Sequence, residues 1–87
     1  MLHRLKILPE YYEAVKSGEK TFEIRRNDRG FTPGDELILQ EYDGKKLTGR
    51  RLRRRCGYIY EGVGKYGLRT GYCVIALKRR SQRKEKE

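Results

Sequence analysis

The chain has 87 residues, 36% of them hydrophobic and 39% charged, which limits it to one domain with a modest core. Its 22 basic and 12 acidic residues leave a net charge of +10. This charge favours a polyanionic partner, with nucleic acid ahead of an acidic membrane surface, although a basic surface can also serve solubility alone.

The basic charge is divided between a folded domain and a tail. We expect the domain to span residues 1–77, which keep a net charge of +6. Residues 78–87 hold six basic and two acidic residues, a composition typical of a disordered basic tail. The domain is therefore basic in its own right.

Several classes of protein are excluded by what the sequence lacks. No apolar run reaches the roughly 20 residues that cross a bilayer, and the N-terminus does not have the pattern of a signal peptide. Cys56 and Cys73 are too few for a disulfide framework and lack the spacing of a zinc site, so we expect buried free thiols. We therefore expect a cytoplasmic protein without membrane contact, metal or cofactor.

The first elements are a strand and a helix. Residues 2–8 alternate, with Leu5 and Ile7 on one face, which predicts a strand. Pro9 suits the first turn of a helix, and Gly18 suits its left-handed end. The apolar face expected for this helix consists of Leu8, Tyr11, Ala14 and Val15.

The segment KTFEIRR, residues 20–26, predicts the second strand. Because side chains alternate along a strand, Phe22 and Ile24 share one face, which we expect to be buried. Glu23 and Arg25 then share the opposite, charged face.

The rest of the domain is predicted to be β-rich. Residues 27–35 have turn chemistry, and residues 36–42 predict a third strand, buried on both faces, before a hairpin turn at Asp43-Gly44. A long β-prone segment, 47–60, and a glycine-rich connection precede a last strand at 71–77. The order predicts an α+β, mainly β fold: a small barrel of five or six strands with one short helix after the first strand.

Four residues around the second strand form a motif, Gly18-x-Lys20-x-x-Glu23-x-Arg25. From residue types alone, its charges can be a surface ion pair worth under about 1 kcal/mol. The motif nevertheless resembles the GxKxxExR signature of ASCH domains, members of the PUA-like superfamily. The H-x-L-K start, FTPGDELIL after the motif and the closing GYCVIAL strand are also similar to a small ASCH-like family of uncharacterised function, so the resemblance spans residues 3–77.

The resemblance implies a pseudo-barrel with a cleft near the junction of the helix and the motif strand, where ASCH domains are inferred to bind RNA or nucleotides. Lys20 would contact a phosphate or carbonyl oxygen, and Glu23 would accept from a base amino group or orient Arg25. Arg25 offers a planar fork to a phosphate or a base edge. Asn27 and Asp28 would lie at the rim of the cleft.

Two further residues enter the expected cleft with the H-x-L-K segment, His3 and Lys6. A lone histidine is more often an ordinary surface or core residue, and a lysine at a strand end is usually solvated. Both alternatives stay open from the sequence.

A second basic feature is GRRLRRRC, in which Arg51, Arg53 and Arg55 fall on one face of an extended strand, about 7 Å apart. Phosphates along a single nucleic-acid strand have a similar spacing, so we expect nucleic-acid contacts here. The alternative is an edge strand that its charges protect from aggregation. Of the nearby tyrosines, Tyr66 is the candidate for base stacking, whereas Tyr58 and Tyr60 share a face with core residues.

We therefore expect a monomeric nucleic-acid-binding module, with RNA as its ligand, rather than an enzyme. The first alternative is a small amidohydrolase acting on an N-acylated nucleoside such as N4-acetylcytidine. Some ASCH-fold proteins resemble such deacylases, but Glu23 occupies the position of their threonine and no partner glutamate follows. The second alternative is an interaction module that binds an acidic protein.

Overall fold

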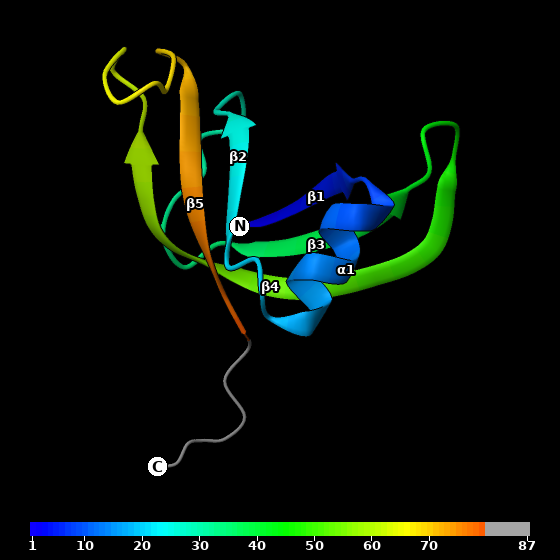
Figure 1. Cartoon of the computed structure of the whole chain (residues 1–87). Coiled ribbons are helices and arrows are strands. Elements are labelled where there is room, and N and C mark those ends of the chain that lie inside the picture. The colour runs from blue at the N-terminus through cyan, green and yellow to red at the C-terminus, as the bar shows by residue number, and fades with distance from the viewer. Residues whose placement is uncertain (80–87) are drawn as a thin grey trace.

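The computed structural model describes residues 1–79, which form a mainly β half-barrel with one short helix after the first strand (Figure 1). The elements are β1 (Leu2–Ile7), α1 (Pro9–Ser17), β2 (Phe22–Arg26), β3 (Glu36–Tyr42), β4 (Leu47–Glu61) and β5 (Tyr72–Lys78). Their order and type confirm the prediction. The tail predicted at 78–87 lies outside the described residues from residue 80 onward.

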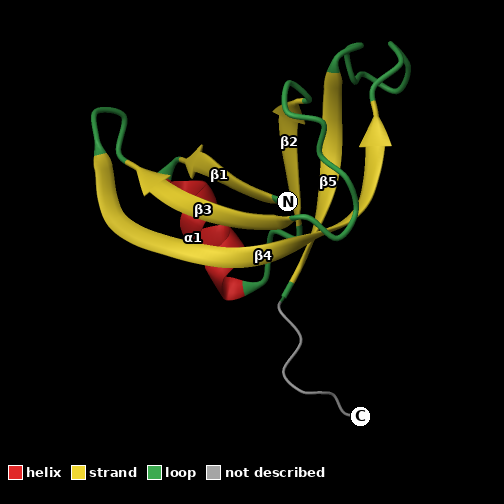
Figure 2. Ribbon diagram, turned by 180° about the vertical axis from the view of Figure 1, so that it is seen from behind, coloured by secondary structure: helices red, strands yellow, loops and turns green. Residues whose placement is uncertain are grey.

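The strands form one curled sheet in the order β1-β3-β4-β5-β2. β1 runs parallel to β3, and the other neighbours are antiparallel. The long β4 pairs with β3 through its first part and with β5 through its last part, and it bends strongly in between (Figure 2). β1 and β2, the two edge strands, therefore come to lie on either side of an open seam. The sheet is thus a curled half-barrel of five strands, which agrees with the small, mainly β barrel expected from the sequence.

The core lies between the inner face of the sheet and α1. Alternation along β1 turns Leu5 and Ile7 inward, and both are buried. β3 is buried on both faces over residues 37–39, as predicted. The buried cluster comprises Leu5, Ile7, Tyr12, Val15, Phe31, Leu37, Leu39, Cys56, Cys73, Ile75 and Leu77.

α1 has the predicted ends. Pro9 lies in its first turn, and Gly18 adopts a left-handed conformation with φ of 90° that other residues disfavour. The buried face of the helix differs from the expectation, because Tyr12 and Val15 are buried while Tyr11 is 44% exposed. Successive side chains of a helix point about 100° apart, so Tyr11 and Tyr12 cannot both face the core. In a helix this short, the few residues that pack decide which of the two is buried.

A β-bulge between Cys56 and Ile59 marks the place where β4 leaves β3 and follows β5. Gly57 lies in this bulge, and a Cβ atom there would approach the Cβ of Ala76 to 3.2 Å. The extra residue reverses the alternation, so Tyr58 is 76% exposed and not on the core face as predicted. The bulge therefore turns the sheet and changes which side chains face outward.

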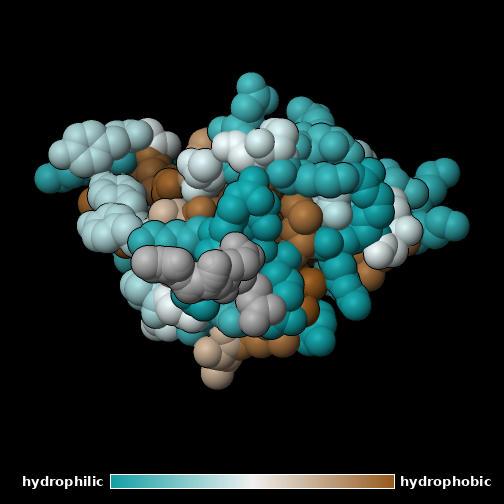
Figure 3. Space-filling view, turned by 90° about the horizontal axis from the view of Figure 1, so that it is seen from below, coloured by the Kyte–Doolittle hydropathy of each residue, from teal (hydrophilic) through white to brown (hydrophobic). Residues whose placement is uncertain are grey.

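Hydrophilic side chains dominate the surface. In the view from below, they cover most of the molecule, and apolar residues reach the surface only in small areas between them (Figure 3). Within residues 1–79 no helix has the length and apolar character that a bilayer crossing requires.

Candidate functional site: a seam cleft and a basic outer face

The motif strand β2 faces the opposite way from the prediction. Glu23 is buried, with 7% exposure, whereas Phe22 and Ile24 are 42% and 53% exposed. Among the strands of residues 1–79, β2 is an edge strand that pairs with β5 alone, and the exposure of Phe22 and Ile24 shows that these residues leave its outward face open. The charged face of β2, and not its apolar face, therefore points into the half-barrel.

Glu23 joins the other two charged residues of the motif. Its Oε1 accepts a hydrogen bond from Lys20 Nζ at 2.9 Å, and its Oε2 accepts one from Arg25 Nε at 2.9 Å. Lys20 Nζ also donates to the carbonyl oxygen of Phe22 at 2.8 Å. A largely buried carboxylate with a cation on each oxygen is a fixed arrangement, because moving either cation would leave part of the charge unpaired.

A hollow of about 340 Å³ lies on the α1 side of Glu23. Its walls include the rings of Tyr11 and Phe22, and Lys20 Nζ lies 5.4 Å and 5.0 Å from the two ring centroids. These distances are typical of cation–π contacts. The hollow thus combines apolar walls with the charged pair at its base.

On the other side of Glu23, a larger cleft of about 380 Å³ follows the seam between β1 and β2. Of the residues predicted for the cleft, this seam cleft is lined by Lys6, Glu23, Arg25 and Asp28. It is also lined by residues that the sequence analysis did not select, including Tyr11, Arg26, Arg29 and Tyr72. The run of charges RRNDR after the motif was the signal that could have indicated Arg29.

Two arginines connect the edge strands across the seam. Arg25 Nη2 donates to the carbonyl oxygen of Lys6, and Arg29 Nη1 donates to that of Arg4 at 2.6 Å. Carbonyl groups on the free edge of β1 would otherwise meet only solvent, because β1 pairs with β3 alone. The guanidinium groups of Arg25 and Arg29 thus donate to backbone carbonyl groups, which leaves fewer of their N–H groups for hydrogen bonds to a ligand.

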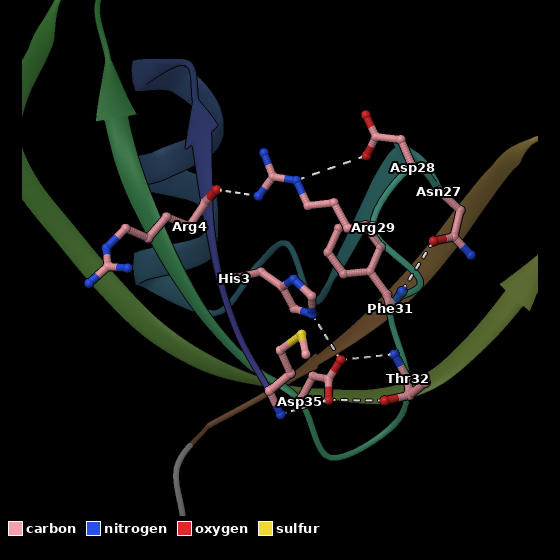
Figure 4. A network of polar contacts seen from close by, with 9 residues as sticks. His3, Arg4, Asn27, Asp28, Arg29, Phe31, Thr32 and Asp35 are labelled. Carbon is pink, nitrogen blue, oxygen red and sulfur yellow. Dashed lines mark hydrogen bonds and ion pairs between the residues drawn. The ribbon is translucent and has the colours of Figure 1, made fainter.

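His3 does not line the seam cleft, in contrast to the prediction. It lies on the inner face of β1, where its ring packs edge-on against Phe31 at 4.7 Å between centroids (Figure 4). His3 Nε2 lies 2.9 Å from Asp35 Oδ2, which also accepts from the backbone N–H of Thr32. The Thr32 hydroxyl and the Met1 amine donate to the other oxygen, Oδ1.

These contacts hold the pKa of the Asp35 carboxyl well below its usual range, with His3 as the main cause. Asp35 therefore joins the start of β1 to the loop that precedes β3. We assign His3 a structural role in this joint.

Asn27 also has a structural position rather than one at the rim. Its Nδ2 donates to Glu61 Oε2 at 2.7 Å, and its Oδ1 accepts from the N–H of Phe31. The neighbouring Asp28 does line the seam cleft, with Arg29 Nε 3.9 Å from its Oδ1. Asn27 thus holds the loop after β2 in place, whereas the adjacent Asp28 lines the cleft, although the sequence predicted both at the rim.

The arginines of β4 have the predicted orientation. Arg51 and Arg53 are exposed and Arg55 is half-buried, all on the outer face, defined as the side of β1, β3 and β4 away from α1. Arg53 pairs with Glu36 of β3. The edge-strand interpretation is wrong, because β4 lies between β3 and β5 in the sheet.

The alternate face of β4 uses its charges internally. Arg54 is buried and donates from Nη2 to the carbonyl oxygen of Val15 near the end of α1, at 3.1 Å. Desolvation lowers its pKa. The five arginines of this run therefore divide into three that face outward and two, Arg50 and Arg54, that contact α1 through Glu13 and Val15.

Tyr66 is 89% exposed and has a positive φ of 57° in the glycine-rich connection. Its ring forms a tilted pair with that of the half-buried Tyr60, with 6.4 Å between the centroids and 56° between the planes. Its predicted part in base stacking remains a prediction.

The two cysteines are buried free thiols, as predicted. Burial raises the pKa of Cys56 to about 11 and also raises that of Cys73. Both are therefore poor nucleophiles. Within residues 1–79 no group of three histidine, cysteine or acidic side chains is arranged to hold a metal ion.

Comparison with known proteins gives a family for the chain. Residues 2–77 match the model of a family described as a domain of unknown function, DUF3850. The chain belongs to this family. It is also similar to an uncharacterised 12.9 kDa protein encoded in the GpA 3′ region of Escherichia phage P2, with 37% identity over 54 residues. This match covers 62% of the chain and 50% of the phage protein, so the chain aligns with about half of its relative.

Proposed function

We propose that this member of the DUF3850 family is a cytoplasmic RNA-binding module, and that the family is related to the ASCH domains of the PUA-like superfamily. The observation that carries the proposal is the outward-facing series Arg51, Arg53 and Arg55 on a central strand, of which the first two are exposed and the third is half-buried. Exposed arginines that repeat about every 7 Å can contact successive phosphates, and such contacts supply most of the affinity for nucleic acid.

The seam cleft supports a second, more selective contact. Glu23 and Arg25 line this cleft, and Glu23 also binds Lys20, which lines the smaller hollow beside the ring of Tyr11. A fixed carboxylate between two cations can distinguish ligands by hydrogen bonding, whereas phosphate contacts on the outer face do not distinguish sequences. We therefore expect the outer face to provide affinity and the cleft to provide selectivity.

The amidohydrolase alternative finds less support in the geometry. The residues that line the two hollows beside Glu23 carry no aliphatic hydroxyl group, so neither offers a serine or threonine nucleophile. Lys20 Nζ is already bound to Glu23 and to a backbone carbonyl oxygen. A reaction there would require a water nucleophile and a lysine released from both contacts.

Fluorescence anisotropy with labelled RNA over a series of salt concentrations tests the proposal. Contacts from three arginines predict that the logarithm of the association constant falls with that of the salt concentration with a slope of about −2 to −3. Arg51→Ala combined with Arg53→Ala should weaken binding to all sequences alike, and Lys20→Ala or Arg25→Ala should change the preference among ligands.

Failure to bind RNA at low salt would overturn the proposal. Partner capture that survives nuclease treatment of the sample would instead favour the interaction module with an acidic protein.

A further inference from the structure

The register of the sheet brings cations from two separate parts of the sequence to the outer face. Arg4 of β1 is in register with Ile38 of β3, and Ile38 is in register with Arg53 of β4. The next row along the same face consists of Lys6, Gln40 and Arg51. Each row therefore has a cation at both ends, one from β1 and one from β4, with β3 between them.

These cations form two parallel columns, which we call the basic columns: Arg4 and Lys6 on β1, and Arg51, Arg53 and Arg55 on β4. Because β3 separates the two strands, the columns stand about 10 Å apart, twice the usual strand spacing. Along β4, alternate residues repeat about every 6.8 Å. The outer face is thus basic along two lines, and not along the single stripe that the sequence suggested (Figure 2, in which α1 lies behind these strands).

Between the columns, β3 presents Glu36, Ile38 and Gln40, and Tyr42 follows at the end of the strand. The Nζ of Lys6 lies 4.8 Å from the centroid of the Tyr42 ring, so a cation of the β1 column already contacts the ring that β3 offers. Ile38 is only 8% exposed although it points outward, as expected when long neighbouring side chains cover it. Gln40 is half-buried, and its amide can both donate to and accept from a hydroxyl group. The strip between the columns is therefore low and polar.

Resting on the proposed RNA-binding function, we propose that the basic columns bind double-stranded RNA across its minor groove, with β1 facing one phosphate backbone and β4 the other. The minor groove of A-form RNA is wide and shallow and displays 2′-hydroxyl groups, so a sheet face can lie across it. Gln40, between the columns, would meet these hydroxyls.

Two other forms of nucleic acid fit the face less well. The B-form minor groove is only about 6 Å wide, narrower than the column separation. A single strand follows one line of phosphates and gains much of its affinity from stacking on rings, and the ring that β3 offers, that of Tyr42, is already in contact with Lys6.

The test compares a short RNA duplex, a DNA duplex of the same sequence and the unpaired RNA strand, all at one salt concentration, by fluorescence anisotropy. We expect the RNA duplex to bind at least about tenfold more tightly than the other two. Arg4→Ala and Arg51→Ala remove one exposed cation from each column, and each should reduce the salt slope for the RNA duplex by about 1. Lys45→Ala, at the tip of the β3–β4 hairpin, removes the same charge as a control and should leave that slope unchanged.

The results separate this inference from the proposed function. If the unpaired strand or the DNA duplex binds as tightly as the RNA duplex, or if Arg4→Ala behaves like Lys45→Ala, the two-column arrangement is wrong while RNA binding stands. If none of the three nucleic acids binds, both proposals fall. Circular dichroism of each variant confirms that a loss of binding is not a loss of folding.

Discussion

The seam cleft and the outer face both gather basic side chains, yet they use them in opposite ways. Beside the cleft, the buried Glu23 binds both Arg25, which lines the cleft, and Lys20, which lines the smaller hollow, and Arg25 is also bound to a backbone carbonyl group of β1. On the outer face, Arg51 is exposed, and the exposed Arg53 pairs with the half-buried Glu36. A basic side chain beside a buried acid thus stabilises the fold, whereas a basic side chain beside an acid near the surface stays available to an anionic ligand.

The largest expected effect tests the internal use of charge. Glu23→Gln leaves two cations beside a neutral amide in a largely buried position, and we expect the free energy of unfolding to fall by about 2 to 3 kcal/mol. Urea denaturation measures this loss. Glu23→Asp, which keeps the charge on a shorter side chain, is the control and should lose less. Equal losses for both variants would show that geometry, and not charge, holds the motif.

Asp35 extends the same test to pH. Its pKa is lowered in the folded state, so its contacts contribute stability that is present above the unfolded value of about 4 and is lost as the pH falls below it. The groups facing it are His3, Thr32 and the Met1 amine. We expect Asp35→Asn to cost about 2 kcal/mol at pH 7 and to flatten the acid limb of the stability curve. An acid limb as steep as that of the wild type would contradict this assignment.

A smaller effect is expected where β4 passes from the outer face to the seam. In Gly57→Ala, the new methyl group would lie 3.2 Å from the Cβ of Ala76, and we expect a loss of about 1 kcal/mol from overpacking. Thermal unfolding measures it. Ala76→Gly in the same chain removes the opposing methyl group and should recover part of the loss. No recovery would mean that the contact with Ala76 is not the cause, and that the loss comes from the backbone of the bulge or from the side chain of Lys78, whose Cε would lie 2.9 Å from the new methyl group.

The smallest effect on stability is expected on the outer face. Glu36 pairs with Arg53 near the surface, so Glu36→Gln should change the free energy of unfolding by less than about 0.5 kcal/mol. The same change removes the acid between the basic columns and should tighten RNA binding severalfold at low salt. Together with Glu23→Gln, this variant compares the two acids: Glu23 is expected to stabilise the fold, and Glu36 to reduce the positive potential of the outer face. Weaker RNA binding by Glu36→Gln would break that contrast.

Much of the fold could be predicted because its signals are local. Pro9 and Gly18 set the limits of the helix, Asp43-Gly44 turns the hairpin, and alternation identifies the strands. The motif residues Lys20, Glu23 and Arg25 do lie together, since Glu23 binds both cations, and their part in binding a ligand stays a prediction.

What could not be predicted depends on neighbours that are distant in the sequence. Whether Phe22 or Glu23 faces inward is decided by the position of β2 at the seam, and alternation alone fits both choices. The orientation of Tyr58 depends on a bulge defined by pairing with β5. Arg4 joins the outer face only through the register of β1 with β3, which no local pattern encodes.

The sheet order has a consequence for the width of the seam cleft. β1 and β2 are close in sequence but are the first and last strands of one curled sheet, so their separation accumulates the twist and curl of all four strand pairings. A small change in curvature anywhere along β4 is therefore amplified at the opening. A ligand that changes the curvature of the outer face would therefore also change the width of the seam cleft, without contacting the residues that line it.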